Sequence, residues 1–153
     1  MICLYKPLIP QTNKIKKMLY DKANDHQDKE EFMELSLTHA HTHIGMFLGW
    51  IVQNDLASED FEDEAGLQMR NFLERSVSCG IFSELWDGVI SDEMLNKEAI
   101  KFADAYYASG KYIEDYRKVF PKYDSMYLVE DNWENYEKVA KVLDMRFLEW
   151  KNM

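Results

Sequence analysis

Cysteine, proline and glycine are scarce in this sequence of 153 residues, which contains two, three and six of them. The two cysteines, Cys3 and Cys79, are too few for a disulfide framework or a zinc knuckle, so we expect a reduced, cytoplasmic protein. Scarce glycine and proline favour long helices over a turn-rich β architecture. No apolar run reaches the roughly twenty residues that cross a bilayer, and residues 1–20 hold none of signal-peptide length.

Basic residues are also few relative to acidic ones. Eighteen basic residues stand against 28 acidic ones, and the formal net charge is −10. Such a charge repels nucleic acid and anionic membranes, so we expect neither as a partner. It favours solubility or a partner with a basic surface.

Hydrophobic residues are plentiful, at 46% of the sequence, and they recur with helical spacing. One wide stripe predicts a helix over about 38–54, begun by Thr38 or Thr42. Its members are Ile44, Phe47, Leu48, Ile51 and Val52. A second stripe follows Ser58, a good N-cap, and Gly80 suits its end. Its members are Phe61, Ala65, Met69, Phe72 and Ser76.

Later segments continue this pattern. A helix is expected over about 97–109, and one or two turns over "YIEDYRKVF". The last helix opens at "EDNWENY", where Asp131 and Glu134 have capping-box spacing, and then presents a seam of apolar residues at intervals of three and four. Its members are Trp133, Tyr136, Ala140, Leu143, Phe147 and Trp150.

The fold prediction is a compact all-α bundle of about five to seven helices. It places an extended lead-in at residues 1–18 and a single helical domain at 19–153. The segment "SMYLVE" alone resembles a strand, and a lone strand has no ladder partner.

Three histidines, His39, His41 and His43, stand at alternate positions before the first stripe. On a helix, His39 and His43 are four apart and have the spacing to chelate one metal ion, with His26 or a carboxylate as a third ligand. The simpler interpretation places His43 at the helix start, hydrogen-bonded to a neighbour, with His39 and His41 in solvent. No Glu lies beside either histidine as in His-Glu-x-x-His enzymes, so we favour the core histidine.

Other catalytic patterns are absent. The sequence has no Gly-x-Ser-x-Gly elbow, no phosphate loop and no dinucleotide fingerprint. Cys79 lacks an identifiable base and is expected to be a buried, inert thiol. We therefore expect neither a catalytic site nor a cofactor.

Acidic and aromatic residues supply the candidate binding surface. The run "DLASEDFEDE" contains six acids and no base, and it serves either as a solvated helix start or as a landing site for a cationic protein. An acidic–aromatic corner follows at Glu130, Asp131 and Trp133, and Tyr107 and Tyr112 are candidate interface anchors. The candidates in the acidic run are Glu59, Asp60, Glu62, Asp63 and Glu64.

Three stretches, "THIGMFLGWIVQNDL", "FADAYYASGKYIEDY" and "MYLVEDNWENYEKVAKVLDMRFLEW", resemble a family of small acidic bacterial proteins of unknown function. The family pattern opens with Tyr-Asp-x-Ala-x-Trp-His. Here "YDKANDH" keeps Tyr20, Asp21, Ala23 and His26, but Asn24 and Asp25 stand where the aromatic is expected. Residues 1–18 look like an addition to the pattern.

The resemblance implies a fold and little chemistry. Small acidic proteins without catalytic motifs are often immunity proteins, and by that analogy we expect an inhibitor that binds a bacterial toxin with a basic surface. The alternative is a metal-dependent enzyme organised by His39 and His43, with His26 as a further ligand.

Overall fold

A computed structural model describes residues 18–32 and 34–153. Within these ranges it contains six α-helices, five 3₁₀ helices and two short strands. The α-helices are α1 (Thr42–Gln53), α2 (Glu59–Leu73), α3 (Cys79–Leu85), α4 (Lys97–Tyr106), α5 (Lys111–Val119) and α6 (Trp133–Lys151). The remaining elements are β1 (Leu19–Lys22), η2 (Ala23–Asp28), η3 (Glu30–Phe32), η4 (Leu37–Ala40), β2 (Val89–Ser91), η5 (Asp92–Met94) and η6 (Met126–Leu128). The predicted compact, mostly helical fold is confirmed.

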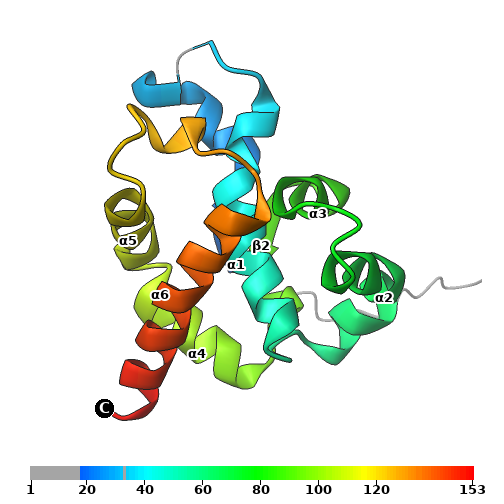
Figure 1. Cartoon of the computed structure of the whole chain (residues 1–153). Coiled ribbons are helices and arrows are strands. Elements are labelled where there is room, and N and C mark those ends of the chain that lie inside the picture. The colour runs from blue at the N-terminus through cyan, green and yellow to red at the C-terminus, as the bar shows by residue number, and fades with distance from the viewer. Residues whose placement is uncertain (1–17, 33) are drawn as a thin grey trace, which may run out of the picture.

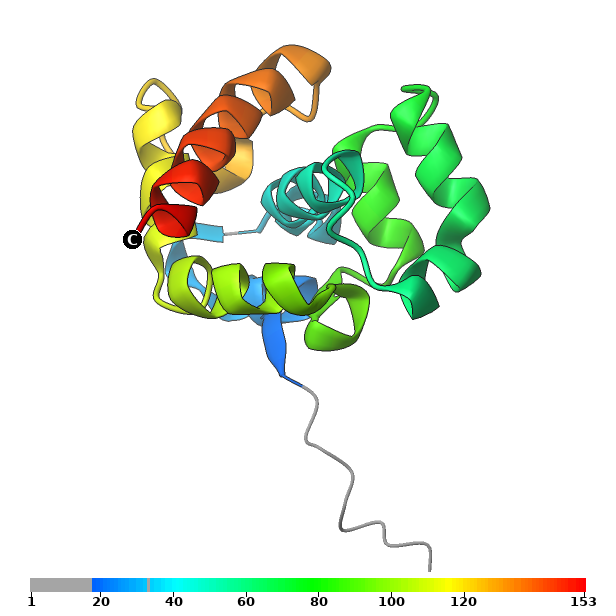
Figure 2. The ribbon, with the colours of Figure 1, turned by 90° about the horizontal axis from the view of Figure 1, so that it is seen from below.

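Helix α1 runs through the middle of the molecule. Helices α2 and α3 lie on one side of it, and α4, α5 and α6 lie on the other (Figures 1 and 2). Every residue from Thr42 to Val52 is buried, because α1 has neighbours all round. The predicted stripe is therefore confirmed, although neither threonine caps the helix: its N-cap is His41, which makes no side-chain capping bond.

Helix α2 begins as predicted and ends earlier than predicted. The Ser58 hydroxyl accepts the backbone N–H of Phe61 at 3.1 Å, which confirms the cap. The helix ends at Leu73, and Arg75 then adopts a left-handed backbone conformation (φ 61°) that turns the chain. The predicted end at Gly80 is wrong, since that glycine lies inside α3.

The predicted capping box of the last helix is also wrong. The N-cap of α6 is Asn132, whose side chain accepts the backbone N–H of Asn135 at 2.8 Å. The apolar seam of α6 is confirmed: Tyr136 and Leu143 are buried, and its other members pack against the core.

The short sheet lies where no strand was predicted. Strands β1 and β2 pair antiparallel, with Asp21 opposite Ile90 and an irregularity in register between Leu19 and Asp21. The segment "SMYLVE", expected to be the strand-like one, forms η6 instead. The predicted lead-in, apart from Met18, lies outside the described residues.

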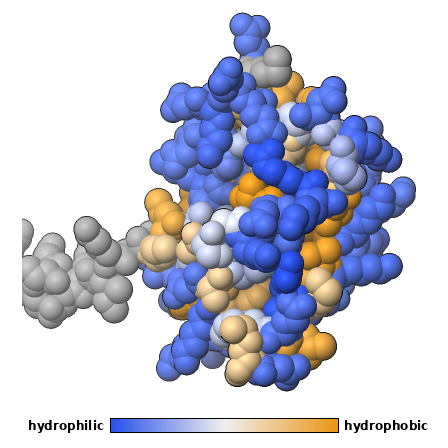
Figure 3. Space-filling model, turned by 90° about the vertical axis from the view of Figure 1, so that its left-hand side faces the viewer, coloured by the Kyte–Doolittle hydropathy of each residue, from blue (hydrophilic) through white to orange (hydrophobic). Residues whose placement is uncertain are grey.

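The surface of the side that carries α5 is mostly hydrophilic, with scattered apolar side chains (Figure 3). Among the described residues, no helix combines the length and apolar character needed to span a membrane.

Candidate functional site

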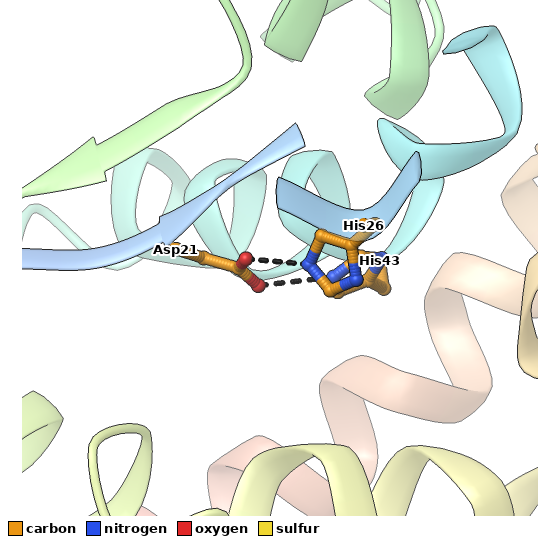
Figure 4. Close-up of side chains that lie close together, drawn as sticks. All are labelled: Asp21, His26 and His43. Carbon is orange, nitrogen blue, oxygen red and sulfur yellow. Dashed lines mark hydrogen bonds and ion pairs between the residues drawn. The ribbon is translucent and has the colours of Figure 1, made fainter. Parts of the chain in front are cut away.

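Three polar side chains from the N-terminal third of the chain meet in the interior. Asp21 lies on β1, His26 on η2 and His43 in the first turn of α1. Directly after β1, the backbone N–H of Ala23 donates to the carbonyl of Gly88 at 2.8 Å, and the chain coils into η2. This bend brings His26 back toward the strand that carries Asp21. We call these three residues the Asp–His–His cluster (Figure 4).

The carboxylate of Asp21 is the centre of the cluster. Its Oδ1 lies 2.6 Å from Nε2 of His26, and its Oδ2 lies 3.0 Å from Nε2 of His43 (Figure 4). The hydroxyl of Tyr107 donates a further hydrogen bond to Oδ2. The carboxylate is thus held from two sides and has little freedom to rotate.

Tyrosines enclose the cluster. The hydroxyl of Tyr127 lies 2.5 Å from Nδ1 of His26, and the hydroxyl of Tyr112 donates to the backbone carbonyl of His43 at 2.6 Å. The rings of His26 and His43 meet edge to face, with centroids 4.6 Å apart. Exposure of the side chains is 10% for Asp21, 8% for His26 and 1% for His43, so bulk water reaches the cluster poorly.

Burial and hydrogen bonding set the charges of the cluster. Burial of Asp21 opposes ionisation, but hydrogen bonds from the two histidines outweigh it and hold the pKa of this carboxyl well below its usual range. For His43, burial dominates the hydrogen bond to Asp21 and lowers the pKa of the imidazole. Burial also raises the pKa of Tyr127 to about 12, so its hydroxyl keeps its proton at neutral pH. The cluster therefore contains a carboxylate beside a neutral imidazole.

The chemistry open to this arrangement is limited. One carboxylate oxygen and two imidazole nitrogens lie within 4.8 Å of one another. Among the described residues, these three side chains form the one cluster of three or more potential metal ligands. Without an ion, the same atoms form a hydrogen-bonded network that ties β1 and η2 to α1.

The predicted pair of His39 and His43 is not the pair that the fold brings together. Nδ1 of His39 lies 2.9 Å from the backbone carbonyl of Tyr127, and His39 is not a member of the cluster. His43 lies buried at the start of α1 and is hydrogen-bonded to a neighbour, Asp21, as the simpler interpretation placed it. His41, expected in solvent, is buried, with Nδ1 2.9 Å from the hydroxyl of Ser83.

The acidic candidates lie together on the first turns of α2. All five are exposed, and none forms an ion pair with a residue that the structure describes. They are Glu59, Asp60, Glu62, Asp63 and Glu64. Some of them line a groove of about 630 Å³ between α2 and the segment that follows α3, which we call the acidic groove. Its lining includes Asp60, Asp63, Glu64, Trp86, Asp87 and Glu93.

The tyrosine candidates are not surface anchors. Tyr107 and Tyr112 are 4% and 1% exposed, and their hydroxyls are bound to the side chain of Asp21 and the carbonyl of His43. Helical spacing placed Tyr107 off the inward stripe of α4. It is buried nonetheless, because β1 and α1 cover that side, where its ring packs on Phe47.

The acidic–aromatic corner has a structural role in part. The carboxylate of Asp131 accepts hydrogen bonds from the hydroxyl of Ser78 at 2.6 Å and the backbone N–H of Gly80 at 3.0 Å, at the start of α3. Trp133 is half-buried, and the guanidinium of Arg75 lies 4.6 Å from its ring centroid. Glu130 is exposed.

Sequence reasoning missed Asp21 as a site residue, and also the part of the acidic groove formed by Trp86, Asp87 and Glu93. A signal for Asp21 was present, because Asp21 and His26 both stand in the "YDKANDH" stretch that carries the family resemblance. No local pattern links that stretch to His43.

Fold and site together define a small α-helical domain with a buried carboxylate–imidazole centre and an acidic surface groove. The chain belongs to the family of the domain of unknown function DUF7832, whose model matches residues 19–129. The match covers all three members of the Asp–His–His cluster and every residue that lines the acidic groove. No curated protein and no solved structure matches the chain. The predicted resemblance to a family of unknown function is confirmed.

Proposed function

We propose that this protein is an immunity-type inhibitor that binds the catalytic domain of a bacterial toxin through the acidic groove. The observation that carries the proposal is the set of exposed carboxylates on the first turns of α2, which have no cationic partner among the described residues. The toxin as partner rests on analogy with other small acidic proteins that lack catalytic motifs.

The acidic groove has the chemistry to receive a lysine or arginine side chain. Phe61 and Trp86 meet edge to face, with centroids 5.0 Å apart, and both line the groove. An aromatic wall beside carboxylates suits a cationic head on an aliphatic stem.

Charge would act mainly on the rate of association. With a net charge of −10, the protein attracts a basic partner over distances comparable with the Debye length, about 8 Å at physiological ionic strength. An inhibitor that must reach its toxin quickly gains from such steering. We expect neither nucleic acid nor membrane to compete, since both are anionic.

A matched pair of variants tests this proposal. Glu59, Asp60, Glu62 and Asp63 are changed together to Ala, which moves the formal net charge from −10 to −6. The control changes four exposed acids elsewhere, which gives the same net charge. They are Asp28, Glu30, Glu34 and Asp124.

The polypeptides encoded by the genes adjacent to this one are expressed in cells one at a time, and both variants are compared with wild type against any that is toxic. Wild type and the control should restore growth, and the α2 variant should fail or protect weakly. With purified toxin, the α2 variant should associate at least tenfold more slowly and with a weaker salt dependence. Failure of wild type to protect, or equal loss in both variants, contradicts the proposal.

Thermal melts of both variants accompany these measurements. Three of the four substituted acids lie in the first turn of α2, where each stabilises the helix by about 0.3–1 kcal/mol. A lower melting temperature is therefore expected for the α2 variant, and binding is compared well below it.

A further inference from the structure

No member of the Asp–His–His cluster lines the acidic groove, and the charge balance of the cluster is unusual. Asp21 is a nearly buried carboxylate, yet its ion-pair contacts among the described residues are to His26 and His43, with no lysine or arginine. Hydrogen bonds from His26, His43 and Tyr107 stabilise this carboxylate in its ionised form, which is the form that binds a metal ion. A neutral imidazole at His43 offers a hydrogen bond but no positive charge.

Both imidazoles present the same atom, Nε2, to this carboxylate. Two histidine nitrogens and one carboxylate oxygen form the ligand set of several zinc and iron(II) sites. Ligand atoms around a tetrahedral zinc ion lie about 3.3 Å apart, given bonds of about 2.0–2.1 Å. The contacts of 2.6 Å and 3.0 Å are made by different oxygens of Asp21. One carboxylate oxygen and the two imidazole nitrogens lie within 4.8 Å of one another, so changes of at most about 1.5 Å bring the three donors to tetrahedral spacing.

The surroundings supply outer contacts for two of the three ligands, His26 and Asp21. Metal-bound histidines usually donate their other ring N–H to an oxygen, which fixes the tautomer. Nδ1 of His26 already faces the hydroxyl of Tyr127 at 2.5 Å, and the hydroxyl of Tyr107 holds Oδ2 of Asp21. Both tyrosines come from later parts of the chain, so the fold itself places their hydroxyls beside the ligands before any ion binds.

We propose that Asp21, His26 and His43 bind a divalent transition-metal ion of the zinc class. Each ligating imidazole frees the Nε2 lone pair by moving its proton to Nδ1. At His26 that proton then points at Tyr127, whose hydroxyl changes from donor to acceptor. The ion replaces the two hydrogen bonds to Asp21 and compensates its charge.

The role of such an ion is structural. Tyrosine rings enclose the cluster, and the exposures of its three side chains leave little room for a substrate. Structural zinc sites contribute folding energy and are four-coordinate, so the second carboxylate oxygen of Asp21 or one enclosed water would supply the fourth ligand. The ion joins β1 and η2 to α1. This inference does not depend on the proposed inhibitor function.

Zinc binding to the full chain, purified without an affinity tag, tests the proposal. The protein is titrated with Zn²⁺ in excess Mg²⁺, which occupies surface carboxylates, and the bound metal is counted after dialysis. We expect one tightly bound equivalent and a melting temperature that rises with Zn²⁺ concentration. Co²⁺ should give the visible absorption bands of a low-coordinate nitrogen–oxygen site.

Variants then locate the ion. Asp21→Asn should lose the tight equivalent, whereas His39→Gln should keep it, because His39 lies outside the cluster. Tyr127→Phe leaves all three ligands in place and should weaken Zn²⁺ binding 10- to 100-fold through loss of the outer contact. The otherwise wild-type chain and all variants are compared in a Cys3→Ser background, which removes a competing thiol.

Three outcomes would overturn the proposal: no stoichiometric zinc on wild type, equal zinc on Asp21→Asn and wild type, or loss of zinc in His39→Gln. Imidazole ¹⁵N spectra add a readout that does not require any variant. If both Nε2 atoms remain protonated in the presence of excess Zn²⁺, the cluster is a hydrogen-bonded network alone.

Discussion

Replacing Gly45 by alanine tests the contact between α1 and α3 that fixes the start of α1, two residues from His43. A Cβ atom built on Gly45 would lie 1.9 Å from the carbonyl oxygen of Cys79 and 2.4 Å from its carbonyl carbon. Both are backbone atoms, which cannot rotate away. Gly66 is the matched control, since it also lies inside a helix and a Cβ there meets nothing within 4 Å.

Both substitutions gain stability from the higher helix propensity of alanine. Alanine is better than glycine inside a helix by about 1 kcal/mol, so Gly66→Ala should stabilise the protein by about that amount. At Gly45 the same gain is opposed by overpacking, which costs about 1–3 kcal/mol and more where backbones must separate. We expect Gly45→Ala to destabilise the protein by about 2 kcal/mol, which lowers its melting temperature by roughly 4–8 °C.

Urea unfolding followed by circular dichroism measures both free energies of unfolding on the same scale. The two substitutions should change the free energy of unfolding in opposite directions, with equal m-values. If Gly45→Ala is as stable as Gly66→Ala, the helices do not approach each other as closely as described.

Three further predictions concern the buried histidines, the start of α3 and Asp21. Burial lowers the pKa of His43 and of His41, so the unfolded protein takes up protons near pH 6.5 that the folded protein excludes. In the metal-free protein the free energy of unfolding should fall as pH drops from 7 to 5, by up to about 1.4 kcal/mol per pH unit for a fully excluded proton, as measured by urea titration at several pH values. Asp131→Ala should cost about 1–2 kcal/mol through loss of two contacts at the start of α3, while Ser78→Ala, which removes a capping hydroxyl, should cost about 1 kcal/mol. Asp21→Asn should destabilise the metal-free protein by about 2–3 kcal/mol, because hydrogen bonds to a buried charge are strong; a loss below 0.5 kcal/mol would contradict the described network.

Helices were predictable from this sequence because their signals are local. The stripes of α1 and α2 and the seam of α6 repeat every three or four residues, and Ser58 caps its helix as its residue type suggests. Helix ends were less predictable where another segment intervenes. Asp131 has capping-box spacing with Glu134, yet its carboxylate is drawn to the start of α3, and Asn132 takes its place.

The candidate site also divides into features with a local signal and features that depend on distant segments. Exposure of the acidic run on α2 could be predicted from composition, since a block of charges seldom enters a core. The Asp–His–His cluster could not, because its formation depends on the pairing of β1 with a strand about seventy residues later. Tyr107 and Tyr112 were misplaced for the same reason: the segments that cover them are distant in sequence. Only the presence of Asp21 and His26 in one family-like stretch pointed toward the cluster.

The cluster and the acidic groove are joined through the small sheet. Val89 and Ser91 of β2 line the groove, and they pair with Lys22 and Leu19 on β1. Between those two pairs stands Asp21, which the cluster ties to α1. Because an isolated pair of short strands is marginally stable in water, β2 depends on whatever anchors β1. The two proposals are therefore compatible. An ion bound at the Asp–His–His cluster would anchor β1, and β1 would hold β2 in place as a wall of the acidic groove.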